Sequence, residues 1–85
     1  MPWDRRQAEQ LGDTVRRLRL EKQLSQETLA FGAGITKNQV QLIESGRSSG
    51  RADASGPSNP RMATLVGLAE VLEVTVSDLM RGADL

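Results

Sequence analysis

The chain is 85 residues long, which fits one small domain, and its 11 basic and 11 acidic side chains give a net charge of zero. It contains no cysteine and no histidine, which excludes disulfide bonds, zinc sites built from these residues and imidazole catalysis. No apolar run is long enough to span a bilayer and no signal peptide opens the chain. We therefore expect a cytoplasmic protein with no cofactor and no metal.

The charges are unevenly distributed along this neutral chain. Residues 62–85 contain Arg81 as their single basic side chain, against the acidic residues Glu70, Glu73, Asp78 and Asp84. Such a distribution fits a protein with a DNA-facing side and an acidic far side. It also fits an ordinary solvated surface, so charge alone leaves the partner open.

A first helix is predicted from Asp4 to about Lys22. Asp4 is placed to cap it, with Gln7 as the partner of a capping box. At helical spacing, its core stripe consists of Ala8, Leu11, Val15 and Leu18. Arg16 and Arg17 lie on the remaining faces, where they form either a functional basic cluster or a solvated helix face.

Two short helices joined by a tight turn are predicted over residues 25–46. Ser25 and Thr36 are suitable N-caps for the two helices, and Gly34 permits a tight or left-handed turn between them. Gly46 stands at the position where a glycine commonly ends a helix. The spacing assigns to the buried faces Leu29, Ala30, Ala33, Val40 and Ile43.

Residues 47–59 form a Gly/Ser-rich stretch that contains Pro57, and this composition predicts a flexible loop. The stretch is not a phosphate-binding P-loop, because no strand precedes it and it lacks Gly-Lys-Ser/Thr. Either it is a solvated insertion, or its residues Arg47 and Arg51 reach nucleic-acid phosphates and the loop orders on binding.

Two further helices complete the chain. Asn59-Pro60 is predicted to open the fourth, since proline suits a first helical turn, and Thr75 caps the fifth with Asp78 as its capping-box partner. Their predicted core positions are Met62, Leu65, Leu68, Ala69, Leu72, Val76 and Leu79. Gly82 is expected to end the last helix and residues 82–85 to form a frayed tail. The fold class is therefore all-α, with five short helices in a single domain.

Several short motifs occur in a fixed order along the chain, namely Leu11-Gly12, Leu24–Glu27, Leu29–Gly34, Ile43–Gly46 and Asn59-Pro60. Together they resemble the Cro/CI-type, or Xre, family of helix-turn-helix regulators from about Leu11 to Leu79. This resemblance implies a five-helix, lambda-repressor-like DNA-binding domain. The long loop 47–59 departs from the family, in which this connection is usually only a few residues.

The resemblance also assigns roles to individual residues. It implies a structural ion pair between Arg19 and Glu44, and it places helix 37–45 in the major groove of DNA. The predicted base contacts are Lys37, Asn38, Gln41 and Leu42, and the predicted backbone contacts are Gln26, Thr36, Gln39, Arg47, Ser48 and Arg51. Lysine suits guanine, asparagine suits adenine, and leucine suits the thymine methyl group. Each of these residues is alternatively an ordinary exposed side chain.

The predicted function is sequence-specific regulation of transcription, most simply repression, by a homodimer on a palindromic operator. Small stand-alone members of the family are typically phage or mobile-element repressors and restriction–modification controllers. The expected dimer interface contains Val74, Val76 and Met80. The alternative is a protein-interaction or antitoxin-like module that binds a partner through Leu20, Phe31 and Trp3, although single exposed apolar residues need no function. No nucleophile–base pair suggests an enzyme.

Overall fold

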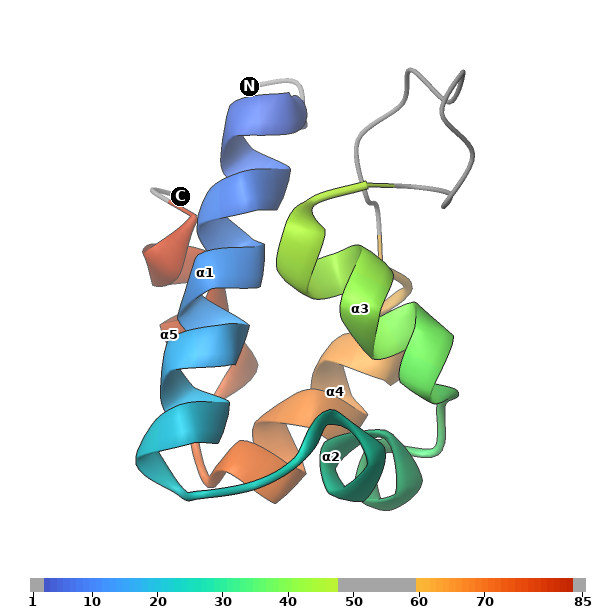
Figure 1. The fold of residues 1–85 in the computed structure, drawn as a ribbon. Coiled ribbons are helices and arrows are strands. Elements are labelled where there is room, and N and C mark those ends of the chain that lie inside the picture. The colour runs from blue at the N-terminus through green and yellow to red at the C-terminus, as the bar shows by residue number, and fades with distance from the viewer. Residues whose placement is uncertain (1–2, 48–59, 84–85) are drawn as a thin grey trace.

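The computed structural model describes residues 3–47 and 60–83, and within these ranges the chain forms five α-helices (Figure 1). They are α1 (Arg5–Glu21), α2 (Gln26–Ala33), α3 (Lys37–Ser45), α4 (Met62–Leu72) and α5 (Val76–Gly82). Asn59, residues 84–85 and the predicted loop after Arg47 lie outside the described residues. None of the helices in the described part is long and apolar enough to cross a membrane.

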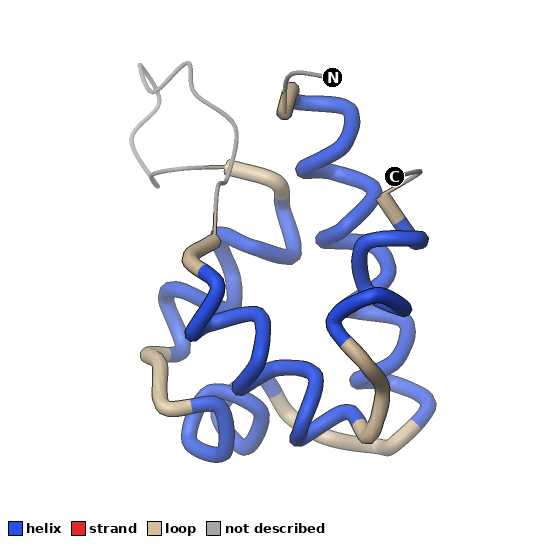
Figure 2. The backbone as a smooth tube through the Cα atoms, turned by 180° about the vertical axis from the view of Figure 1, so that it is seen from behind, coloured by secondary structure: helices blue, strands red, loops and turns tan. Residues whose placement is uncertain are grey.

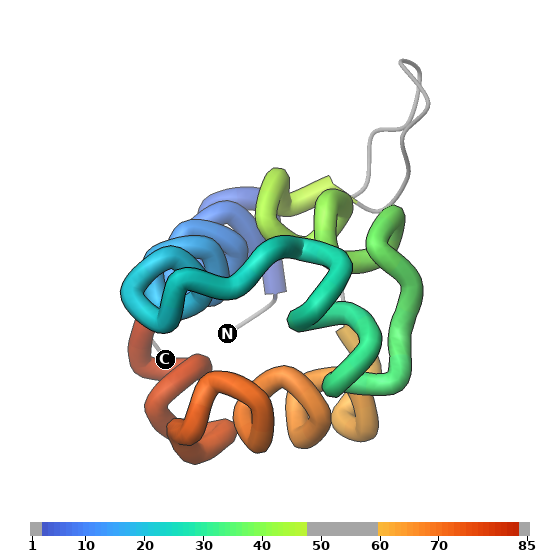
Figure 3. Tube along the Cα trace, turned by 60° about the horizontal axis from the view of Figure 1, so that its bottom comes forward, coloured from blue at the N-terminus to red at the C-terminus, as the bar shows by residue number. Residues whose placement is uncertain are grey.

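The helices pack around one core. α1 lies against α3 and α5, while α2 lies against α3 and α4. Seen from behind, the same helices are joined by short connections at the α1–α2, α2–α3 and α4–α5 junctions (Figure 2). Figure 3 shows α4 and α5 along one side of the molecule and α1 and α3 along the opposite side. α3 is therefore held from two directions, by α1 and by α2.

Local hydrogen bonds start α1, α2, α3 and α5 where the sequence predicts. Asp4, Thr36 and Thr75 each accept a hydrogen bond from the backbone N–H three residues later, and each forms a complete capping box. Ser25 caps α2 through its hydroxyl, which accepts from Thr28 N–H at 3.0 Å. The predicted turn is also confirmed, because Gly34 has a φ of 75°, in the left-handed region that glycine tolerates.

Most of the predicted core is buried. Leu11, Val15, Leu29, Val40 and Leu79 are at most 1% exposed, and Leu68 and Leu72 join them from α4. Leu18, Ala33 and Val76 are half-buried against this cluster. The core therefore draws on all the helices that the structure describes, which suits a small domain with a limited apolar interior.

The start of α4 differs from the prediction. The N-cap is Arg61 and the helix begins at Met62, so Pro60 precedes the helix instead of lying in its first turn. Met62, predicted to face the core, is 64% exposed. Met62 lies on the same face of α4 as Leu65. It is the first residue of the helix, however, and lies one turn before Leu65, where the core has already ended.

The predicted end of the last helix at Gly82 is confirmed, but the frayed tail predicted over residues 82–85 is wrong at Gly82 and Ala83. Gly82 belongs to α5, and Ala83 is 0% exposed as part of the core. A Cβ at position 82 would collide with the side chain of Thr14 in α1. Close packing between the end of α5 and α1 therefore keeps this segment ordered as far as Ala83.

A second close approach fixes the position of α3. A Cβ on Gly12 of α1 would collide with the carbonyl oxygen of Ile43 and would lie 2.7 Å from that of Glu44. The backbones of α1 and α3 can cross this closely only because position 12 has no side chain. The sequence motif Leu11-Gly12 thus has a packing role, which is to seat the last turn of α3 on α1.

Candidate nucleic-acid interface

α3 presents one apolar and one polar side. Val40 and Ile43 are 0% and 6% exposed and anchor the helix to the core. Lys37, Asn38 and Gln41 are exposed on the polar side, and Leu42 is half-buried. A helix of this width that exposes polar side chains can enter the major groove of B-DNA, where each base pair displays a distinct pattern of donors and acceptors.

The first turn of α3 uses two of the predicted backbone contacts for its own cap. Thr36 N–H donates to Gln39 Oε1 at 2.9 Å, and Gln39 N–H donates to Thr36 Oγ1 at 3.1 Å. This role of Gln39 was missed at the level of sequence, although Thr-x-x-Gln matches the Asp-x-x-Gln spacing recognised at Asp4. The cap occupies the side-chain oxygen of Gln39, so its amide nitrogen is the group that can donate to a phosphate.

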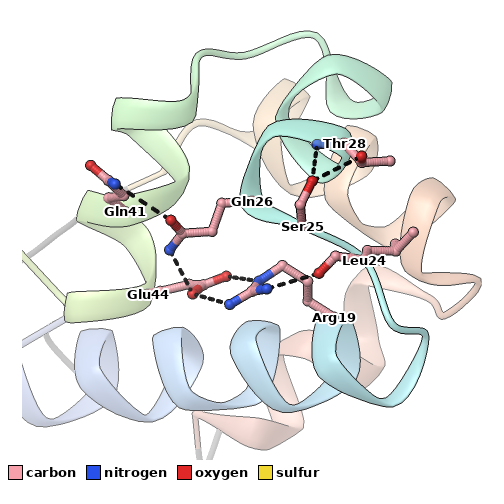
Figure 4. A network of polar contacts seen from close by, with 7 residues as sticks. All are labelled: Arg19, Leu24, Ser25, Gln26, Thr28, Gln41 and Glu44. Carbon is pink, nitrogen blue, oxygen red and sulfur yellow. Dashed lines mark hydrogen bonds and ion pairs between the residues drawn. The ribbon is translucent and has the colours of Figure 1, made fainter.

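The ion pair between Arg19 and Glu44 is present and largely buried (Figure 4). Arg19 Nε donates to Glu44 Oε2 at 2.7 Å and Nη2 donates to Oε1 at 3.1 Å. The two side chains are only 10% and 6% exposed. Arg19 Nη1 also donates to the backbone oxygen of Leu24 at 2.8 Å, so one guanidinium ties α1, the α1–α2 connection and α3 together.

Gln26 joins the same network from the first residue of α2. Its Nε2 donates to Glu44 Oε1 at 3.1 Å, and its Oε1 accepts from Gln41 Nε2 at 3.4 Å. Figure 4 shows the side chains of Gln41, Gln26 and Glu44 following one another from the surface of α3 inward. The structure thus brings a predicted base contact and a predicted backbone contact together with the buried ion pair.

The arginines of α1 that the sequence left open take different positions. Arg17 is 62% exposed as a side chain and pairs with Glu21 at 3.1 Å within α1, which fits a solvated helix face. Arg16 instead lines a hollow that it shares with Arg19, Gln26, Gln41, Glu44 and Ser45. Arg16 is therefore on the same side of the molecule as the polar network of α3.

The residues predicted to contact a protein partner, Leu20, Phe31 and Trp3, do not form one cluster, and a partner surface through them stays a prediction. Trp3 is half-buried against the core, whereas Leu20 is 53% and Phe31 is 90% exposed. Trp3 precedes α1 and Leu20 lies in its last turn, so most of the length of α1, roughly 25 Å at a rise of 1.5 Å per residue, lies between them. Hydrophobicity alone grouped these residues in the sequence, and the length of α1 separates them.

The remaining predicted site residues fall into two groups. Val74, Val76 and Met80 are half-buried at the edge of the core, around the connection between α4 and α5. Arg47 is exposed directly after α3. Ser48 and Arg51 lie outside the described residues.

These features define the class of protein. A capped helix follows a glycine turn, is clamped onto two neighbouring helices and exposes a polar side of a width that enters the major groove. This is the arrangement of a helix-turn-helix DNA-binding protein.

Comparison with known proteins agrees with this class. Residues 10–81 match the family model of the helix-turn-helix domain, and the chain belongs to this family. The chain is also similar to the solved structure of the restriction-modification controller protein C.AhdI from Aeromonas hydrophila, with 32% sequence identity and a TM-score of 0.69. That match covers 85% of this chain and 94% of the controller. No curated protein gives a significant match.

The family match and the structural likeness confirm the predicted recognition as a Cro/CI-type helix-turn-helix regulator. The protein is therefore a DNA-binding transcription regulator.

Proposed function

We propose that this regulator binds palindromic operator DNA as a homodimer and represses transcription, with α3 of each subunit in the major groove. The observation that carries the proposal is the mounting of α3. Its polar side faces outward, while Val40, Ile43 and the buried pair of Arg19 and Glu44 hold its other side rigidly. A rigid mount lets the same few side chains meet the same base edges in every complex.

The proposed base contacts are the exposed or half-buried residues of the polar side of α3. Lys37 donates to guanine O6 and N7, and Asn38 pairs with adenine N6 and N7. Leu42 rests on a thymine methyl group, and Gln41 contacts a base next to it. The exposure of these side chains in the free protein supports the assignment.

The proposed backbone contacts surround this helix. Gln26, Thr36 and Gln39 donate from the helix starts, and Arg47 donates from the end of α3. Arg16 joins them because it lines the same hollow as Gln26 and Gln41. Ser48 and Arg51 remain proposals for the segment beyond the described residues. Phosphate contacts of this kind fix the register of a protein on DNA without selecting a sequence.

Dimerisation through Val74, Val76 and Met80 completes the proposal. Their half-buried position leaves apolar surface at one edge of the domain, away from the polar side of α3. A symmetric dimer matches two half-sites about one helical turn, ~34 Å, apart. Because the similar protein from Aeromonas hydrophila is a restriction-modification controller, control of such a gene system is the first candidate role.

The deciding experiment selects bound sites from randomised double-stranded DNA at a stated salt concentration, with sedimentation analysis of the free and bound protein. We expect a palindromic consensus and two subunits per site. A monomer on a non-palindromic site would contradict the dimer proposal. Retention of a stoichiometric protein partner, together with no DNA retardation at low salt, would favour an antitoxin-like module instead.

A further inference from the structure

The hydrogen bonds between Gln41, Gln26 and Glu44 run in one direction. Gln41 Nε2 donates to Gln26 Oε1 at 3.4 Å, and Gln26 Nε2 donates to Glu44 Oε1 at 3.1 Å. Glu44 is the buried end of this series, and its carboxylate also receives two donors from Arg19. Gln41 is the exposed end.

The chemistry of the buried end dictates this direction. A carboxylate paired with an arginine can only accept hydrogen bonds, whereas a glutamine side chain has one donating and one accepting end. Gln26 must therefore turn its nitrogen toward Glu44, which leaves its oxygen facing Gln41. Gln41 must answer with its own nitrogen, and its oxygen then points away from Gln26 (Figure 4).

We propose that Glu44 is a positioning residue that sets, through Gln26, which end of the Gln41 side chain α3 offers to a base. This inference rests on the proposed DNA-binding function. An outward oxygen accepts from an amino group in the major groove, and the second hydrogen of Gln41 Nε2 is available for an acceptor beside it. Adenine provides this combination through N6 and N7, whereas guanine presents acceptors only. Glu44 thus biases position 41 toward adenine without approaching DNA.

The geometry suits control of orientation better than control of position. The bond between Gln41 and Gln26 is longer than the bond between Gln26 and Glu44, so Gln41 can still adjust to a base. The buried bonds are short and charged, with 2.7 Å between Arg19 Nε and Glu44 Oε2. The rigid end of the series is therefore inside the protein and the adjustable end is at the surface.

The variant E44Q tests the proposal because it should invert the series. The shorter bond from Arg19 Nε would hold the new amide oxygen at the position of Oε2, so the amide nitrogen would take the position of Oε1 and face Gln26, and Arg19 Nη2 would lose its acceptor there. Gln26 would then turn its nitrogen toward Gln41, and Gln41 would offer its own nitrogen to the DNA. We expect the preferred base at the position read by Gln41 to change from adenine to an acceptor base, guanine or thymine.

Two further variants make the test independent of the ion pair. Q41A identifies the operator position that Gln41 reads, because the preference for one base should be lost at that position in this variant. Q26A interrupts the series at its half-buried middle residue. It should reduce a preference for adenine of about tenfold or more to less than about threefold at that position alone. Q26A also loses a proposed phosphate contact, which lowers affinity for all sequences equally. S45A is the control in the same hollow. It should change neither the base preference nor the overall affinity, because the Ser45 hydroxyl donates to Leu42 O and not to the series.

The measurements are binding titrations on an operator with each of the four base pairs at that position, and thermal unfolding of each variant. An unchanged preference in both Q26A and a folded E44Q overturns the proposal while DNA binding stands. If E44Q does not fold, Q26A alone decides.

Failure of the proposed function is distinguished by a measurement without DNA. NMR of the free protein should show slower solvent exchange of the Gln26 side-chain amide protons in wild type than in Q41A/E44Q, in which neither neighbour offers an acceptor to that amide. Equal exchange overturns the arrangement itself. If exchange is slower in wild type but the protein selects no DNA site, the hydrogen-bond series stands, and the base preference fails together with the proposed function.

Discussion

Glu27 of α2 and Lys37 of α3 form an ion pair across the turn of the helix-turn-helix, with 3.4 Å between Lys37 Nζ and Glu27 Oε1. Both side chains are at least half exposed, so the pair contributes little to stability. Its consequence is functional, because Lys37 is a proposed base contact and must leave Glu27 to reach a guanine.

E27Q should therefore increase DNA affinity. Removing the competing carboxylate frees Lys37 and also removes a negative charge near the phosphates. An exposed pair is worth about 0.2–1 kcal/mol, which corresponds to a gain of up to about fivefold at low salt. Titrations of operator DNA measure the gain, with E21Q as the control because Glu21 pairs with Arg17 on the solvated face of α1. Equal affinities of E27Q and wild type would show that the pair does not restrain Lys37.

K37A and R47A should lose affinity in different ways. K37A should weaken binding to the guanine-containing operator by about 1–3 kcal/mol and leave binding to random DNA nearly unchanged. R47A should weaken both about equally and reduce the salt slope by roughly one, because a phosphate contact releases counterions without selecting a base. Titrations over a salt series compare the two variants. Identical losses of K37A on operator and random DNA would remove Lys37 from the base contacts.

R19M should be strongly destabilising. It leaves the Glu44 carboxylate, which is 6% exposed, without its ion-pair partner, and such losses cost about 3–5 kcal/mol. R19M/E44M removes both charges and should recover most of the lost stability. Urea unfolding of the three proteins gives the free energies of unfolding. A double variant no more stable than R19M would mean that packing, and not the unpaired charge, causes the loss.

G12A tests the close crossing of α1 and α3. The added methyl group meets the carbonyl oxygens of Ile43 and Glu44, so one helix must move. We expect a loss of about 1–3 kcal/mol in the free energy of unfolding, as for other overpacked positions, and weaker operator binding. D13A, at the exposed neighbouring position, should stay within about 0.5 kcal/mol of wild type. Full stability of G12A would contradict the crossing.

Acid should weaken the start of α5. Hydrogen bonding to the backbone N–H and the hydroxyl of Thr75 lowers the pKa of Asp78 from its ordinary value of 3.8. A lowered pKa means that the unfolded chain binds the proton more readily, so the stabilising contribution is complete above pH 3.8 and is lost as the pH falls through the lower folded value. Thermal unfolding from about pH 5 to about pH 2 should show a smaller loss in D78N than in wild type. Parallel curves would contradict this role.

Local signals predicted the helix starts well. Asp4, Ser25, Thr36 and Thr75 bond to backbone groups three residues away, and the turn at Gly34 depends on its own backbone angle. These interactions involve neighbouring residues, so the sequence pattern contains nearly all the information that they need. The exposed side of α3 follows in the same way from the spacing of Val40 and Ile43.

Helix ends and surface groupings were predicted less well. Met62 has the right spacing for the core but lies beyond its edge, and Ala83 is buried where a frayed tail was expected. Leu20 and Trp3 are both apolar, but the length of α1 keeps them apart. Burial at such positions depends on how far a neighbouring helix extends, which periodicity does not encode.

The sequence by itself determined the fold class, the N-caps of α1, α2, α3 and α5, the turn and the polar side of α3, because these follow from residues within about one helical turn of each other. Family resemblance added the pairing of Arg19 with Glu44, which are 25 residues apart. Only the tertiary structure decided that Gln41 and Gln26 meet across 15 residues, that Gln26 reaches Glu44, and that Lys37 meets Glu27. Such contacts depend on the angles and distances at which helices cross, and those are set by the packing of the whole core.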